Sequence, residues 1–181
     1  MNTTTADTTV TTQVHRIYIK ATPQAIWDAI TKPEWTERYG YGGRAEYDLS
    51  PGGAFRAFAS EEMKKAGVEM GIPTPDVIVD GEVVEVDPPR KLVLTWRMVM
   101  DAAMEAEGFT RLTYEIAEGK GGVSKLTVIH ELEGAPALSV LVAGGLEEQG
   151  AGGGWSWVLS DLKSLLETGT TMAGKDPLST E

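Results

Sequence analysis

The chain has 181 residues, with 16 lysine and arginine residues against 27 aspartate and glutamate residues, which gives a formal net charge of −11. Such an acidic surface repels phosphate backbones and anionic lipid headgroups, so nucleic-acid binding and electrostatic membrane docking are not expected. The sequence has no cysteine and two histidines, which excludes disulfides, a cysteine nucleophile and a multi-histidine metal site. No cofactor or metal is expected.

Length and composition predict one domain, since 181 residues fall within the usual range of about 100–200. Residues 1–12 are threonine-rich and polar, and we interpret them as a flexible leader without the features of a signal peptide. Residues 169–181 are poor in core-forming side chains and are interpreted as a flexible tail. The domain is expected over residues 13–168. No segment approaches 18 apolar residues, so no integral membrane association is expected, and a cytoplasmic location is predicted.

The first part of the domain predicts a strand followed by two helices. Residues 13–20 alternate and are rich in β-branched side chains, which is typical of a strand. Thr22 then supplies an N-cap and Pro23 a first helical position, so a helix is expected from there. Pro33 ends this helix and starts a short second one that runs towards an aromatic, glycine-rich turn at residues 39–43.

Two short strands and an insertion follow. Residues 44–49 and 54–59 are predicted strands, joined by the Ser-Pro-Gly-Gly turn at 50–53. Residues 60–75 interrupt the strand pattern, and a short helix is expected over 61–70. We interpret this segment as a lid or an insertion.

The second part predicts four longer strands, at residues 77–86, 91–98, 109–117 and 123–132. Residues 100–108 are expected to be a connection, and residues 134–144 a loop or a short helix. The last element is an amphipathic helix, because apolar side chains recur at i, i+3, i+4, i+7, i+10 and i+11 from Trp155 to Leu166. Gly169 is expected to end it.

This order predicts an α+β fold, in which a curved antiparallel sheet of about six to seven strands wraps on a long C-terminal helix. A gap between the sheet and the helix would form an apolar cavity, which is the usual place for a small-molecule site. The glycines at 150–154 are interpreted as a hinge rather than a phosphate loop, because no Lys-Ser/Thr follows them and two glutamates precede them.

Four motifs, in residues 21–34, 50–56, 81–96 and 153–165, resemble the START-like (SRPBCC) superfamily. The sequence is most similar to its branch of homologues of the activator of heat-shock-protein ATPase, which includes proteins described as polyketide cyclase-like. The resemblance covers about residues 13–168. It implies a helix-grip (START/Bet v-like) fold with a cavity under the last helix. Function is left open by the resemblance, because the superfamily contains lipid carriers, hormone receptors and cyclases.

Candidate ligand-binding residues are those expected on the inner faces of the strands, at the mouth turn, in the insertion or on the last helix. Aromatic and methionine side chains would supply adaptable apolar area, while Arg56 and His130 would supply polar contacts. These candidates are Trp35, Tyr39, Tyr47, Arg56, Phe58, Met70, Trp96, Met98, Tyr114, His130 and Val158. The alternative interpretation for several of them is plain core packing.

His130 and Glu82 are the candidates for a general base, if their strand faces point into the cavity. The alternatives are a structural histidine and a solvated glutamate, with the strand face changing at Gly81. The main hypothesis is a protein that binds a lipid, polyketide or aromatic metabolite. The second is a cyclase or hydrolase that uses the same cavity. The third is a chaperone-associated stress-response interaction protein. A monomer and a homodimer both remain open.

Overall fold

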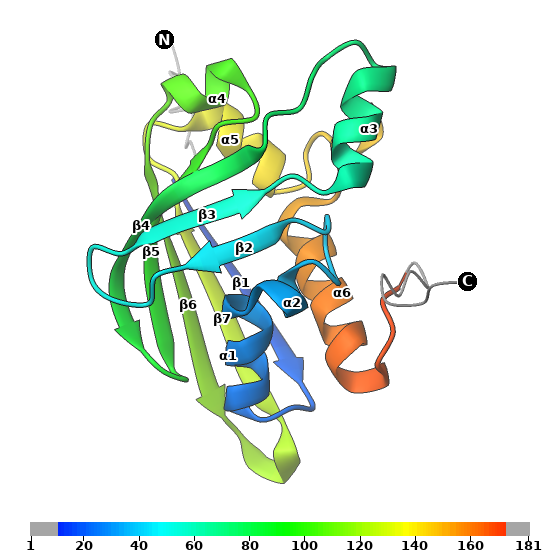
Figure 1. The fold of residues 1–181 in the computed structure, drawn as a ribbon. Helices are drawn as coiled ribbons and strands as arrows, with labels where there is room; N and C mark the ends of the chain where they lie inside the picture. The colour runs from blue at the N-terminus through cyan, green and yellow to red at the C-terminus, as the bar shows by residue number, and fades with distance from the viewer. Residues whose placement is uncertain (1–10, 173–181) are drawn as a thin grey trace, which may run out of the picture.

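Strands with alternating side-chain burial form a seven-stranded antiparallel sheet (Figure 1). The computed structural model describes residues 11–172. The strand order in the sheet is β1-β7-β6-β5-β4-β3-β2. The strands are β1 (Thr12–Ile19), β2 (Arg44–Tyr47), β3 (Ala54–Phe58), β4 (Val77–Asp87), β5 (Lys91–Met98), β6 (Thr110–Glu118) and β7 (Ser124–Glu131).

Six α-helices are described, and α6 is the longest of them. The sheet curves around α1, α2 and α6, while α3 stands away from it at one side (Figure 1). The helices are α1 (Pro23–Thr31), α2 (Pro33–Thr36), α3 (Glu61–Glu69), α4 (Ala102–Ala106), α5 (Pro136–Val142) and α6 (Gly154–Thr168). This arrangement confirms the predicted α+β helix-grip fold, with seven strands.

Local signals in the sequence explain where the helices begin and end. The Thr22 hydroxyl accepts a hydrogen bond from the Ala25 amide at 3.1 Å, which caps α1 as predicted. Pro33 begins α2. Gly169 ends α6 in the left-handed conformation, with φ of 81°. The segment predicted as a plain connection contains α4, because the Asp101 carboxylate accepts hydrogen bonds from two amides of its first turn.

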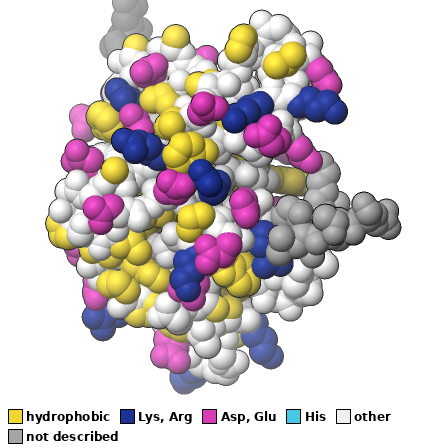
Figure 2. Space-filling model, viewed as in Figure 1, with side chains coloured by type: hydrophobic (Ala, Val, Ile, Leu, Met, Phe, Trp, Pro, Cys, Tyr) yellow, Lys and Arg dark blue, Asp and Glu magenta, His cyan; other side chains and the backbone are white. Residues whose placement is uncertain are grey.

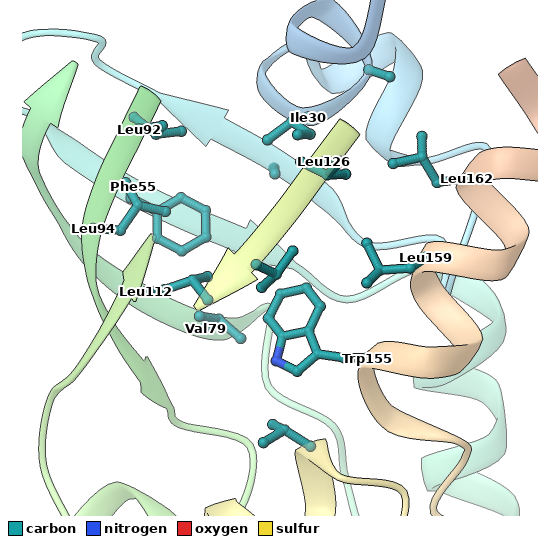
Figure 3. Close-up of a cluster of buried hydrophobic side chains, with 14 of the residues drawn as sticks. Ile30, Phe55, Val79, Leu92, Leu94, Leu112, Leu126, Trp155, Leu159 and Leu162 are labelled. Carbon is teal, nitrogen blue, oxygen red and sulfur yellow. The ribbon is translucent and has the colours of Figure 1, made fainter. Parts of the chain in front are cut away.

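The hydrophobic core lies between the sheet and the helices (Figure 3). Leu159 and Leu162 of α6 are buried against the inner face of the sheet, and Ile30 of α1 joins them. Trp155, at the start of α6, extends its indole towards the strands (Figure 3). Trp155 belongs to this core and also lines the cavity between the sheet and α6.

The predicted leader and tail lie mostly outside the described residues. Thr12 already belongs to β1, so the domain starts slightly earlier than residue 13. Residues 170–172 return along α6, where the Met172 amide donates a hydrogen bond to Asp161 at 2.8 Å. Within residues 11–172, no helix is long and apolar enough to cross a membrane. On the face shown in Figure 2, lysines and arginines are interspersed with acidic side chains.

Candidate functional site

A cavity of about 300 Å³ lies between the inner face of the sheet and the N-terminal end of α6. We call it the sheet–helix cavity. Its walls come from strands β2 to β6, from α6, and from the 39–43 turn, with α3 and α5 at its margin. Aromatic rings supply much of the surface, and every lining residue that the structure describes is uncharged. Such a wall suits an apolar ligand.

Six of the eleven predicted ligand-binding residues lie on this wall. They come from five places in the chain: the mouth turn, β2, β5, β6 and α6. These residues are Tyr39, Tyr47, Trp96, Met98, Tyr114 and Val158. The fold therefore brings together side chains that are up to 119 residues apart in sequence. The remaining five predicted residues lie elsewhere.

Arg56 and Phe58 lie on the outer side of β3, so their predicted place in the cavity is wrong. Phe55 and Ala57 take the inner positions, and strand alternation turns Arg56 and Phe58 outwards. The Phe58 ring instead packs under the Arg44 guanidinium, whose central carbon lies 5.0 Å from the ring centroid. Phe58 lines a separate groove there, together with Lys64 and Asp76.

Met70 and Trp35 are also outside the cavity. Met70 caps the end of α3, and 71% of its surface is exposed. Met63, in the first turn of the same helix, lines the wall instead. Trp35 packs against the core and carries Arg38 over its ring at 4.8 Å.

Glu82 is exposed, which excludes it as a general base in the cavity and agrees with the alternative interpretation of a solvated glutamate. Val86, four residues along the strand, packs towards the core, and plain strand alternation would place Glu82 on the same side. However, the pairing of β4 with β5 shifts between Val83 and Glu85, where β4 carries one extra residue. This bulge inverts the alternation, so Val83 is buried and Glu82 faces solvent.

His130 is completely buried behind the cavity wall, in a chain of hydrogen bonds that joins α6 to three strands. The Trp155 indole N–H donates to His130 Nδ1 at 3.2 Å. The Thr110 hydroxyl donates to the Trp96 carbonyl at 2.9 Å, so it accepts from His130 Nε2–H at 2.8 Å. Because an indole only donates, this chain fixes the neutral tautomer with the proton on Nε2.

The surroundings of His130 oppose its protonation. Burial, with a smaller effect from His15, lowers the pKa of His130 to about 3. Both ring nitrogens are already engaged, and His130 does not line the cavity. The geometry therefore places His130 as a support for the Trp155 and Trp96 indoles, which do form the wall.

Three tyrosines carry the hydroxyl groups of the deeper wall. Burial raises the pKa of Tyr39, Tyr47 and Tyr114, so all three keep their protons at neutral pH. The Tyr47 ring stacks on Phe55 with centroids 4.7 Å apart, and the Tyr114 ring meets Trp155 edge to face. These contacts fix both rings, and the cavity offers neutral hydrogen-bond donors rather than charges.

The mouth is held by contacts between the 39–43 turn and α6. Asp161 of α6 is buried and accepts the Gly40 amide at 2.9 Å. The Tyr41 hydroxyl accepts the Gly154 amide at 3.0 Å, and its ring lies so close to Gly152 that a Cβ there would collide with it. The absence of a side chain at Gly152 thus lets the segment before α6 approach the turn.

Sequence reasoning missed several wall residues, including Phe55, Ala57 and Val79. Phe55 and Ala57 share one strand face, but Ala54 and Phe58 share the other, so the local sequence does not indicate which face is inward. Asp161 was also missed, because nothing in its local sequence indicates a long-range contact. Within the described part of the chain, no group of three histidine, aspartate or glutamate side chains could hold a metal.

The curved sheet, the long final helix and the cavity between them define a START-like helix-grip protein, as the sequence motifs predicted. The family model "Activator of Hsp90 ATPase homolog 1-like protein" matches residues 20–167, and the chain belongs to this family. No curated protein matches the sequence.

Solved structures share the fold at low sequence identity. PFC0360w, described as an HSP90 activator from Plasmodium falciparum, is 20% identical with a TM-score of 0.58, over 86% of this chain and 96% of that one. CalU16 from Micromonospora echinospora is 19% identical with a TM-score of 0.59, over 93% and 71%. An Aha1 dimer from Colwellia psychrerythraea is 17% identical with a TM-score of 0.54, over 87% and 97%.

Proposed function

We propose that this protein binds a small hydrophobic molecule in the sheet–helix cavity. The observation that carries the proposal is the uncharged, mostly apolar wall, with seven aromatic side chains, around about 300 Å³ of space. A cavity of this size forgoes the packing contacts that would otherwise stabilise the core, so an occupant would restore them. Met63, Met98 and Met100 on the wall would let it adapt to an irregular ligand.

The geometry supports binding better than general acid–base catalysis. His130 is enclosed and neutral, and Glu82 faces solvent, so neither reaches the space where a substrate would sit. The hydroxyls of the wall tyrosines retain their protons and suit hydrogen bonding rather than proton abstraction.

Thermal unfolding with a panel of neutral one- to three-ring aromatic compounds and short-chain esters tests the proposal. A ligand at 100 times its Kd stabilises by about 2.7 kcal/mol, which raises the Tm by about 5–10 °C for a chain of this size. A panel in which no compound raises the Tm of the protein would contradict the proposal.

A pair of variants shows whether the binding takes place in the cavity. Ala57→Phe fills the cavity from its β3 wall, and should abolish the rise in Tm. Ala54→Phe, on the exposed side of the same strand, is the matched control and should retain it. If the ligand raises the Tm of both variants equally, it binds outside the sheet–helix cavity.

A second candidate function is association with a chaperone, which is favoured by the family match and by the description of the Plasmodium falciparum neighbour. In this case, the purified protein should raise the ATP hydrolysis rate of purified Hsp90. An unchanged hydrolysis rate at saturating protein would contradict it.

A further inference from the structure

We infer that the ligand is a neutral molecule whose oxygen acceptor is bound by the hydroxyl groups of Tyr47 and Tyr114. This inference rests on the proposed function and names the ligand class for the same cavity. It depends on three features of the wall: the absence of charge, the two hydroxyl groups, and the volume.

The uncharged wall disfavours the binding of an ionised ligand. Removing a carboxylate or phosphate from water costs several kcal/mol unless an opposite charge or several donors compensate for it. Arg56, which was predicted to meet a carboxylate, faces outwards, and the wall residues that the structure describes include no lysine, arginine or histidine. An ionised fatty acid or a phospholipid headgroup would therefore have no partner inside.

Tyr47 and Tyr114 carry the hydroxyl groups that remain available. Within residues 11–172, neither hydroxyl has a hydrogen-bond partner. The other two wall tyrosines differ, since Tyr39 donates to the Ala29 carbonyl at 3.0 Å and Tyr41 accepts from the Gly154 amide. A tyrosine hydroxyl that contacts neither protein nor ligand can bond only to water.

Both free hydroxyls contact open space. Among the described side chains, the Arg38 Nε is the one fully enclosed polar atom without a partner, so the oxygens of Tyr47 and Tyr114 are not enclosed by protein. Both residues line the sheet–helix cavity, which is the space available to them. After burial, Tyr114 and Tyr39 also raise the pKa of Tyr47 electrostatically, so the three side chains lie near one another.

The volume limits the ligand to a small ring system. A cavity of about 150 Å³ accommodates benzene, and this cavity is about twice that size. Two fused rings with one carbonyl, ether or hydroxyl oxygen match both the space and the two donors. An analogue without the oxygen would displace water from the hydroxyls without replacing its hydrogen bonds, so it should bind more weakly.

Calorimetric titration with three probes that share one two-ring skeleton tests this inference: 1-tetralone, tetralin and tetralin-1-carboxylate. The ketone should bind about tenfold more tightly than the hydrocarbon, since two hydrogen bonds to a ligand are together worth about 1.4 kcal/mol or more. The carboxylate should bind at least tenfold more weakly than the ketone. Equal affinities for ketone and hydrocarbon, or tight binding of the carboxylate, would overturn the inference.

Tyrosine variants test whether the preference for the ketone over the hydrocarbon depends on the hydroxyl groups of Tyr47 and Tyr114. Tyr47→Phe combined with Tyr114→Phe removes no hydrogen bond within the described protein, so the variant should fold, and should bind ketone and hydrocarbon equally. Tyr39→Phe is the matched control and should retain the preference, because its hydroxyl is already bound to Ala29. A preference that persists in the double variant would overturn the inference. Failure of both neutral probes to bind wild-type protein would instead contradict the proposed function.

Discussion

His130 stabilises the position of the cavity wall from behind. Its two nitrogens connect the Trp155 indole to the Thr110 hydroxyl, and both partners are themselves buried. A mid-strand histidine in the sequence is compatible with a base, a ligand contact or a structural role. The choice among these roles depends on which residues cover the ring, and these come from elements that are distant in sequence.

Replacing His130 with alanine should lower the free energy of unfolding by about 3 kcal/mol, because it leaves a void and two unpaired polar groups. His15→Ala is the control, since His15 is only partly buried and makes one long contact at 3.4 Å with Gln13. It should cost less than about 1 kcal/mol. Urea unfolding measures both changes, and equal losses would contradict the supporting role of His130.

The same histidine predicts a pH dependence of stability. The unfolded chain binds a proton at this residue below pH about 6.5, whereas the folded chain does so only near pH 3. Falling pH therefore favours unfolding across this window, by about 1.4 kcal/mol per pH unit. The stability advantage of wild type over His130→Gln should shrink with this slope in urea unfolding between pH 6 and 4.5. An advantage independent of pH would show that His130 is protonated in the folded protein.

At the scale of elements, the strands and helices were largely predictable because their signals are local. Capping threonine, helix-starting proline and glycine-rich turns occur next to the segments they delimit, as Thr22 and Gly169 illustrate. The inward faces were less predictable. Residues 54–58 have apolar side chains on both faces, and the pairing of Ala57 with Val79 in β4 decides which face is inward. The bulge in β4 lies beyond Glu82, and Gly81 is the one local sign in the sequence that the strand face changes there.

The start of α6 depends on one glycine. Gly154 has φ of 63°, and a Cβ there would collide with the Val142 carbonyl oxygen. Gly154→Ala should therefore destabilise by about 3 kcal/mol or more and separate α6 from α5. Gly150→Ala is the control, because Gly150 also has positive φ but has open space around it, and should cost about 1 kcal/mol. Equal losses of stability in the two variants, measured by thermal unfolding, would contradict the close approach of Gly154 to the Val142 carbonyl.

At the scale of the whole molecule, an acidic exterior surrounds an uncharged interior space. The net charge of −11 resides outside the cavity, since its described lining carries none of it. The charge therefore affects solubility and the choice of macromolecular partners. The cavity selects its ligand through shape and neutral hydrogen bonds. We propose a monomer or a homodimer, and sedimentation velocity distinguishes the two.

Native mass spectrometry of gently purified protein, compared with the Ala57→Phe variant, tests the central proposal most directly. The wild-type chain should carry one neutral, apolar molecule, which denaturation releases for identification, and the cavity-filled variant should lack it. The same added mass on both proteins, or no added mass on either, would contradict binding in the sheet–helix cavity.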